Sequence, residues 1–475
     1  MDATGLAFTG IAEQARLIAA GEVSSRELVE LYLERIARFD SQLNAYRVLF
    51  AERALLEADQ ADARRGAGAA RPLLGVPIAV KDDIDVAGEV TAMGSNAYGD
   101  PKREDAEVVR LLREAGAVII GKTNVPELCM WPFTETVTWG STRNPWDLQR
   151  APGGSSGGSG AAVAAGLVGG ALGSDGAGSI RIPAAWCGLF GLKSQRDRVP
   201  MAPHLAAWHG LSVNGLLGRT VADTALFLDV IAGADGGEAE GGVPERGSFA
   251  GALARQAGAG GPRLRIAYSR KVPPGILAKL DPDAERAFEQ TIELLRSLGH
   301  EVQERNPEFG FETVGQVLAR MLKGIADEAA AMPYPRRLER RTRTMARIGA
   351  LLPGSALAWA QRNEAALRER LGRVFAEHDV LLTPAVAQPP PRIGQFEGRG
   401  AVWTLNAVSG LVPYNSPWNV TGQPACSVPA GLGTDGLPRA VQLVGRVDDE
   451  AGLLALAAEI EAARPWAQQR PAQFA

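Results

Sequence analysis

The sequence predicts an α/β protein with one large core, and three observations support that fold class. Short apolar runs typical of buried strands alternate with amphipathic helical patterns, and the alternation recurs in the second half of the chain. Hydrophobic residues make up 46% and charged residues 22% of the 475 residues, which is ordinary for a globular protein. No charge block or low-complexity tract divides the chain, so we expect a single domain over residues 1–475.

The predicted elements follow in order. Ser24 and Glu27 form a capping-box pattern, which begins a helix within a helical N-terminal region of about residues 1–65. A buried strand at 76–80, a helix at 104–115 and a strand at 117–120 come next. The later elements are helices at 221–232 and 283–298, strands at 264–267 and 380–382, and a long surface loop at 235–262.

Composition excludes several classes of function. A net charge of −4 argues against a surface built for nucleic acid. The stretch 151–174 carries no charge, but it is so rich in glycine and serine that buried loops and a short helix are expected there, not a membrane span. Cys129, Cys187 and Cys426 lack a paired metal spacing, so we expect three reduced thiols in a cytoplasmic protein with no metal and no cofactor. The first residues carry no signal-peptide pattern.

The segment 153–193 is the candidate for the chemistry, because it places serines among glycines. It contains no histidine that could act as a local base. A serine nucleophile in such a segment needs another base. Lys81 ends the apolar run at 76–80 and is the candidate. A lysine accepts a proton only in its neutral form, which apolar surroundings favour and nearby carboxylates disfavour. We therefore predict that Asp82 and Asp83 point away from Lys81.

Three boxes carry a resemblance to a known family. Lys81 begins a K-D-x-x-x-V-x-G segment, residues 153–158 read Gly-Gly-Ser-Ser-Gly-Gly, and residues 175–184 contain Ser-Ile-Arg-x-Pro-Ala. Further matching segments follow in the same order at 121–127, 142–147, 219–233 and 417–431. In these features the chain resembles the amidase signature family. The resemblance implies a large mixed β-sheet covered on both sides by helices.

The resemblance also implies a mechanism and a site. Ser179 would attack the acyl carbon, Ser155, held in a cis peptide, would relay the proton, and Lys81 would be the terminal base. A small-molecule amide or carbamate (urethane) would be the substrate, and a homodimer would be the usual assembly. The remaining implied site residues are Gly176, Ala177 and Gly178 for the oxyanion hole and Cys129, Met130 and Trp131 for substrate binding. Core packing is the alternative role for the last three.

One position departs from the family pattern. Ala177 and Gly178 stand where the family has Gly-Gly, and the methyl group of Ala177 limits the φ values available there. This variant is similar to the branch of 6-aminohexanoate cyclic dimer hydrolases, so linear and cyclic amides, anilides and carbamates are the expected substrates.

Other functions remain open at this point. The A subunit of glutamyl-tRNA amidotransferase, which releases ammonia from glutamine, is the alternative within the family. Residues 116–123 match the P-loop pattern G-x-x-x-x-G-K-[ST], although their interior reads as a buried strand. His204 and His209 are close enough to form a base or metal pair, but no ligand cluster accompanies them.

Overall fold

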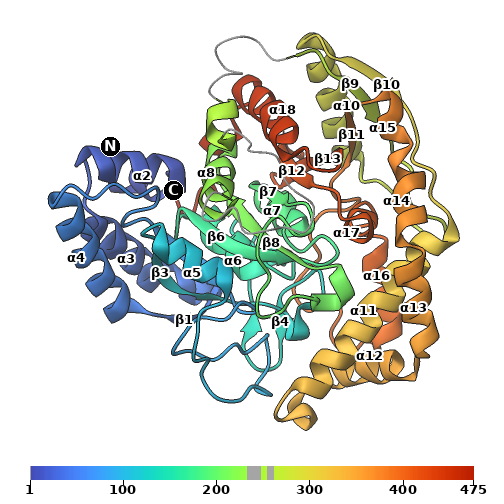
Figure 1. Ribbon diagram of the computed structural model, residues 1–475, viewed down its shortest axis with the longest axis horizontal. Coiled ribbons are helices and arrows are strands. Elements are labelled where there is room, and N and C mark those ends of the chain that lie inside the picture. Colours follow the sequence, from blue (N-terminus) through green and yellow to red (C-terminus); the bar gives the residue numbers. More distant parts are fainter. Residues whose placement is uncertain (1, 233–247, 254–261) are drawn as a thin grey trace.

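A computed structural model describes residues 2–232, 248–253 and 262–475 (Figure 1). Its centre is an 11-stranded sheet in the order β1-β3-β2-β6-β8-β7-β12-β13-β11-β9-β10, with β4 and β5 paired separately. The strands are β1 (Tyr46–Leu49), β2 (Pro77–Lys81), β3 (Val118–Thr123), β4 (Glu135–Thr136), β5 (Gly140–Ser141), β6 (Gly170–Asp175), β7 (Phe190–Lys193), β8 (Val213–Gly218), β9 (Arg265–Tyr268), β10 (Glu301–Glu304), β11 (Val380–Pro384), β12 (Ala425–Leu432) and β13 (Pro438–Gly445).

The sheet is mixed. β2 runs parallel to both β3 and β6, and β9 runs parallel to β10 and β11. The strands between these two parallel groups, from β6 through β8, β7, β12 and β13 to β11, pair antiparallel. The predicted α/β class and the large mixed sheet are therefore confirmed.

The helices cover this sheet. Those in the first half are α1 (Ala3–Ala7), α2 (Ile11–Ala20), α3 (Ser25–Leu43), α4 (Ala51–Gly66), α5 (Glu107–Glu114), α6 (Gly157–Ala164), α7 (Arg181–Cys187) and α8 (Val221–Ala232). Those in the second half are α10 (Pro282–Ser297), α11 (Phe311–Ala331), α12 (Arg340–Leu351), α13 (Gly354–Arg362), α14 (Glu364–Gly372), α15 (Val374–Glu377), α16 (Ala401–Ser409), α17 (Pro417–Thr421) and α18 (Glu450–Ala463).

Two helix pairs flank the centre of the sheet. The glycine- and alanine-rich helix α6 contacts α7, α6 packing on β6 and α7 on β7, β12 and β13. The apolar helices α8 and α18 also contact each other, α8 packing on β7 and β8 and α18 on β12 and β13. Helices α11 to α14 gather beyond the sheet, on the right of Figure 1. Residues from α11 join Trp131, Trp208 and Trp418 in a second hydrophobic cluster beside the main core.

The N-terminal region is mainly helical, with β1 inserted between α3 and α4. Ser24 and Glu27 form the predicted capping box at the start of α3. The chain termini lie close together in Figure 1, where the C-terminal Phe474 packs its ring edge against Phe39 of α3. Arg35 also donates a hydrogen bond to the Phe474 carbonyl, so the last residues close over α3.

The predicted strands and helices agree with β2, β3, β9, β11, α5, α8 and α10, with ends displaced by a few residues. Most of the predicted loop at 235–262 lies outside the described residues. Where residues 248–250 are described, Asp229 of α8 accepts hydrogen bonds from them. None of the helices in the described ranges has the length and apolarity needed to cross a membrane.

Candidate active site

Lys81 lies at the carboxyl end of β2, beside the carboxyl end of the parallel strand β6. Its side chain is fully buried, as its place after an apolar strand predicts. The side-chain nitrogen Nζ donates hydrogen bonds to Ser155 Oγ at 2.7 Å and to Ser174 Oγ at 2.6 Å. The structure therefore brings the predicted base and the predicted relay serine into direct contact.

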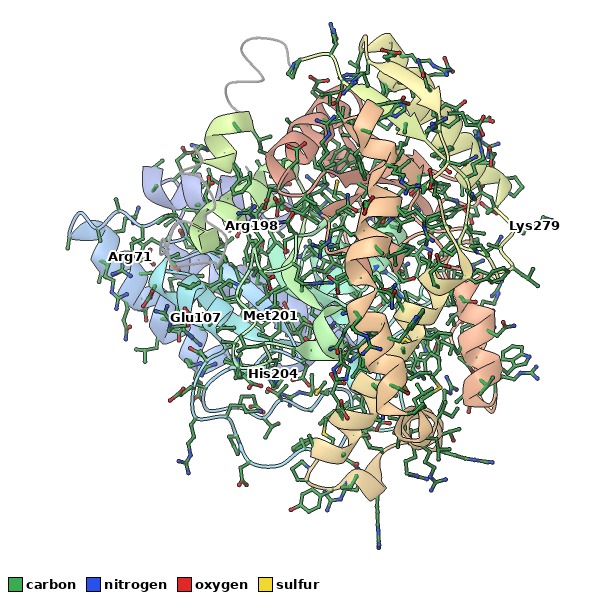
Figure 2. The ribbon with its side chains drawn as sticks, turned by 45° about the vertical axis from the view of Figure 1, so that its right-hand side comes forward. Arg71, Glu107, Arg198, Met201, His204 and Lys279 are labelled. Carbon is green, nitrogen blue, oxygen red and sulfur yellow. The ribbon has the colours of Figure 1, made fainter. Side chains whose placement is uncertain are left out.

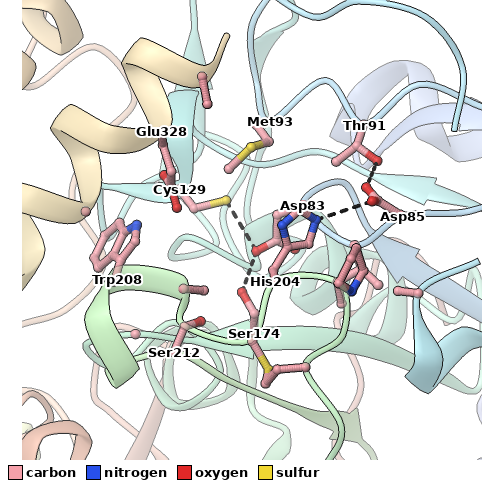
Figure 3. Close-up of a pocket in the computed structure, with 18 of the residues that line it drawn as sticks. Asp83, Asp85, Thr91, Met93, Cys129, Ser174, His204, Trp208, Ser212 and Glu328 are labelled. Atoms are coloured by element: carbon pink, nitrogen blue, oxygen red, sulfur yellow. Dashed lines mark hydrogen bonds and ion pairs between the residues drawn. The ribbon is translucent and has the colours of Figure 1, made fainter.

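The two aspartates that follow Lys81 behave differently. Asp82 turns away and pairs with Lys122 and Arg47, as predicted. The prediction for Asp83 is wrong, because Asp83 Oδ2 lies 3.2 Å from Lys81 Nζ and accepts a 2.5 Å hydrogen bond from Ser174 Oγ (Figure 3). The chain turns sharply after β2, so consecutive side chains face different surroundings.

Ser155 precedes α6, and the peptide bond between Gly154 and Ser155 is cis, as the family resemblance implies. Gly154 is needed here because a Cβ would lie 2.4 Å from the carbonyl oxygen of Trp131. The neighbouring serines are held by the backbone. Ser156 Oγ donates to the Ser174 carbonyl, and Ser159 Oγ contacts Thr123 Oγ1 at 2.7 Å, so both support the loop.

Ser179 lies on the loop between β6 and α7, next to the Ser155 segment. Its carbonyl oxygen accepts a hydrogen bond from the Ser156 N–H at 3.2 Å, and Ser155 and Ser179 line one cavity. Asp175 fixes this loop by accepting from the N–H groups of Gly178 and Ile180 and by pairing with the buried Arg181. Burial alone would raise the pKa of Asp175, but the Arg181 guanidinium holds it well below its usual range.

The backbone N–H groups of the predicted oxyanion loop differ in whether they already have a hydrogen-bond acceptor. The N–H of Gly178 is already taken by Asp175 at 2.7 Å. Within the described part of the chain, no protein acceptor takes the N–H groups of Gly176, Ala177 or Ser179. Gly178 has φ +120°, which an L residue rarely adopts, whereas Ala177 is absent from the positive-φ positions. The alanine is thus tolerated at 177 because the unusual backbone falls on Gly178.

Two cavities meet at Ser179. The first, which we call the polar cavity, has a volume of about 660 Å³ and contains Ser155, Ser174 and Ser179 in its wall. Its acidic, basic and histidine lining residues are Asp83, Asp85, Asp100, Lys102, His204, His209, Asp327 and Glu328. Met201 and His204 lie close together on the segment that borders it (Figure 2). Acidic side chains therefore outnumber Lys102 in this wall.

The second, which we call the apolar cavity, has a volume of about 360 Å³. Cys129, Met130 and Trp131 all line it, together with apolar side chains of α11 and α16 such as Val317 and Leu405. Cys129, Ser179 and Trp208 line both cavities. Ser179 consequently stands between a polar and an apolar compartment.

Two groups near Lys81, Glu328 and Cys129, have raised pKa values. Burial raises the pKa of Glu328 on α11 to about 8, with a further contribution from the Asp83 charge. Burial also raises the pKa of the Cys129 thiol well above its usual value, again with a contribution from Asp83. Both groups are thus uncharged at neutral pH. Sequence reasoning missed Glu328 and Ser174, because one comes from a distant helix and the other precedes the matched box.

The remaining predicted motifs do not form separate sites. His204 pairs with Asp85 and His209 with Asp327, so the two histidines have different partners. No cluster of candidate metal ligands occurs among the residues that the structure describes. The P-loop match at 116–123 ends within β3, where Lys122 pairs with Asp82 at 2.9 Å, so it is unsuited to cradle phosphate.

Comparison with known proteins places this geometry in a family. The family model described as Amidase matches residues 27–454. The chain belongs to the amidase family. Among its amidase relatives, the protein AmiB2 of Mycobacterium tuberculosis is 54% identical over 471 residues, which cover 99% of each chain.

Two solved structures of amidase-family proteins are similar to this fold. The structure of 6-aminohexanoate cyclic dimer hydrolase with substrate matches with a TM-score of 0.88 and 31% identity, covering 99% of this chain and 100% of the other. The A subunit of glutamyl-tRNA(Gln) amidotransferase from Thermotoga maritima matches with a TM-score of 0.72 and 28% identity, covering 93% and 92%. This amidase is therefore a hydrolase of amide C–N bonds.

Proposed function

We propose that the protein is a metal-independent amidase that works through an acyl-enzyme on Ser179. The observation that carries this proposal is the buried 2.7 Å hydrogen bond from Lys81 to Ser155, beside Ser179 on the cavity wall. A hydroxyl bonded to a buried amine is a suitable proton relay, because both groups can donate and accept.

In the proposed reaction, protons move between the nucleophile and the base through Ser155. Ser179 Oγ bonds to the acyl carbon while its proton passes to Ser155 and the Ser155 proton passes to neutral Lys81. The N–H groups of Ala177 and Ser179 would hold the oxyanion, with Gly176 shaping the turn that presents them. The C–N bond then breaks as the proton returns through Ser155 to the departing nitrogen. Water releases the acyl group by the same steps.

The two cavities suggest how a substrate would lie. The acyl chain would occupy the apolar cavity, where Cys129, Met130 and Trp131 contact it, and the amine side would face the polar cavity. This arrangement suits medium-length aliphatic or aryl acyl groups. Cyclic amides, linear amides, anilides and carbamates are all accommodated by the same steps. The buried thiols of Cys129, Cys187 and Cys426 suit a reducing compartment, so we place the enzyme in the cytoplasm.

A fluorophosphonate tests the nucleophile and requires no substrate. It forms a Ser–O–P bond with loss of fluoride, and intact mass spectrometry with peptide mapping locates the adduct. We expect a single adduct on Ser179 that Ser179→Ala abolishes, and amine release from a panel of amides, anilides and carbamates that is lost in the same variant. Ser159→Ala, which changes a buried serine of α6 outside both cavities, is the matched control, and its Ser179 should still be labelled.

The likeness to the amidotransferase A subunit makes glutaminase activity the second candidate. Ammonia release from glutamine, with no turnover of the amide panel, would favour that function. Labelling of a serine other than Ser179 would overturn the proposed mechanism in either case.

A further inference from the structure

Lys81 has an acidic neighbour that the scheme above does not use. Asp83 Oδ2 lies 3.2 Å from Lys81 Nζ and accepts from Ser174 Oγ at 2.5 Å. Ser174 Oγ in turn accepts from Lys81 Nζ at 2.6 Å. The three side chains close a triangle, so the lysine nitrogen is tied to the carboxylate both directly and through a hydroxyl (Figure 3 shows the Asp83–Ser174 contact).

The other titratable groups that face this triangle are uncharged at neutral pH. Cys129, from the short 3₁₀ turn after β3, donates its thiol to Asp83 Oδ2 at 3.5 Å. Glu328 approaches from α11 and lies next to Cys129 in Figure 3. Burial raises the pKa of both groups, so the thiol and the carboxyl keep their protons at pH 7.

The remaining acids near this end of the sheet are paired with other cations. Asp82 bonds Lys122, Asp175 bonds Arg181, and Asp85 bonds Lys102 at 3.3 Å and His204 at 3.3 Å. Of the carboxylates in the described ranges, Asp83 is thus the one whose charge contacts the Lys81 nitrogen.

We propose that Asp83 is a positioning residue that stabilises the ammonium form Lys81 takes when it accepts the serine proton. The inference rests on the proposed function, in which Lys81 is the terminal base. An adjacent carboxylate stabilises a cation, more strongly where burial limits contact with solvent, and the Ser174 hydroxyl bonds to both groups. Asp83 keeps its charge throughout; the proton moves only between Ser179, Ser155 and Lys81.

Two consequences follow for the rate. In the free enzyme the same carboxylate favours the ammonium, which must lose a proton before it can act, so hydrolysis requires a higher pH. During attack on the substrate, it stabilises the ammonium that forms. Removing the charge should therefore move the acid limb of the pH–rate profile downward and also lower the plateau, and these two changes together are the signature of the proposal.

The test measures the second-order rate of fluorophosphonate labelling of Ser179 from pH 5 to pH 10. In Asp83→Asn we expect the midpoint of the acid limb to fall by about one pH unit or more and the plateau to fall by up to about tenfold. Asp83→Glu keeps the charge and should retain a midpoint close to that of the wild type. Asp85→Asn, the matched control, neutralises an acid of the same cavity that Lys102 and His204 already pair, and its midpoint should not move.

The outcomes separate the two proposals. An unmoved midpoint in Asp83→Asn, with or without a lower plateau, overturns the role of Asp83, since a merely structural change lowers labelling equally at every pH. Should Asp83→Asn fail to fold, Asp83→Ser removes the same charge and decides the question on the same measurement. Full labelling of a Lys81→Ala variant would overturn both the role of Lys81 as the base and the role of Asp83. Loss of labelling in Lys81→Ala would support Lys81 as the base, whatever the result for Asp83.

Discussion

Lys81 and Lys122 are two lysines on adjacent strands that have different surroundings. Both are fully buried, and the parallel register pairs Val80 with Lys122, so the two lysines point to opposite faces of the sheet. Asp82 joins Lys122 and the guanidinium of Arg47 in a closed ionic cluster. Lys81 instead meets two hydroxyls and one carboxylate at the edge of a cavity.

The difference lies in how fully each charge is neutralised and how far it is from solvent. In the Lys122 cluster the side chains of Asp82 and Arg47 are 1% and 5% exposed, and Lys122 has additional acceptors at the Val90 carbonyl and Thr91. Breaking a buried pair by removing one partner is strongly destabilising. In the Lys81 cluster, Asp83 retains 12% side-chain exposure on the cavity wall, so protons can be exchanged there. We therefore expect the Lys122 cluster to stabilise the fold and, under the proposed function, the Lys81 cluster to transfer protons.

The largest expected effect is on activity. Lys81→Met should lower kcat/KM on any amide that the wild type hydrolyses by at least about 10⁴-fold, because the members of a catalytic relay fail together. Urea unfolding should show stability unchanged within about 1 kcal/mol or increased, as is common when a reactive group is replaced. Lys102→Met, which removes a half-exposed lysine of the same cavity, should stay within about tenfold of wild type. Comparable losses in both variants would contradict the special role of Lys81.

The second effect is on stability. Asp82→Asn leaves the buried Lys122 without a carboxylate and Arg47 with only the part-exposed Glu89 at 3.2 Å, so the free energy of unfolding should fall by about 3–5 kcal/mol. Urea unfolding followed by tryptophan fluorescence measures this loss, and kcat per folded molecule should change little. Asp59→Asn is the control, since Asp59 is 54% exposed in a surface pair with Arg26 and should cost less than about 1 kcal/mol. A loss below that level in Asp82→Asn would mean that the ionic cluster is dispensable.

The same comparison shows what the sequence could predict. Strands β2 and β3 were predictable because they are continuous apolar runs, and the capping box of α3 is a local signal. Strands β6 and β8 were not predicted, because Gly170–Asp175 and Val213–Gly218 are rich in glycine and short of β-branched residues. The order of the strands depends on pairings between distant segments, which no local pattern encodes.

The site was predictable to a similar degree. The matched boxes indicated Lys81, Ser155 and Ser179, and the structure brings the first two into contact. The direction of Asp83 was not predictable, because strand alternation no longer applies once the chain turns after Lys81. Glu328 carries no sequence signal, since one acid within a long amphipathic helix resembles its exposed neighbour Asp327. Only the packing of α11 over the cavity distinguishes the two.

Glu328 gives the third predicted effect, a pH dependence of stability. Its pKa rises from an ordinary 4.5 to about 8 on folding, chiefly because of burial. Between about pH 5 and pH 8 the folded protein thus holds a proton that the unfolded chain has released, so this group makes stability fall as pH rises. Glu328→Gln removes that proton exchange. Unfolding free energies at pH 5, 6, 7 and 8 should therefore decline less steeply in the variant than in the wild type.

Asp59→Asn provides the control, because that carboxylate is 54% exposed, pairs with Arg26 and should leave the wild-type slope in place. Parallel curves for wild type and Glu328→Gln would mean that the carboxyl ionises freely beside Asp83. In that event a second negative charge would face Lys81. The charge of Lys81 would then be neutralised about as fully as the charge of Lys122. A shallower slope in Glu328→Gln alone would instead leave Asp83 as the charge that acts on the lysine.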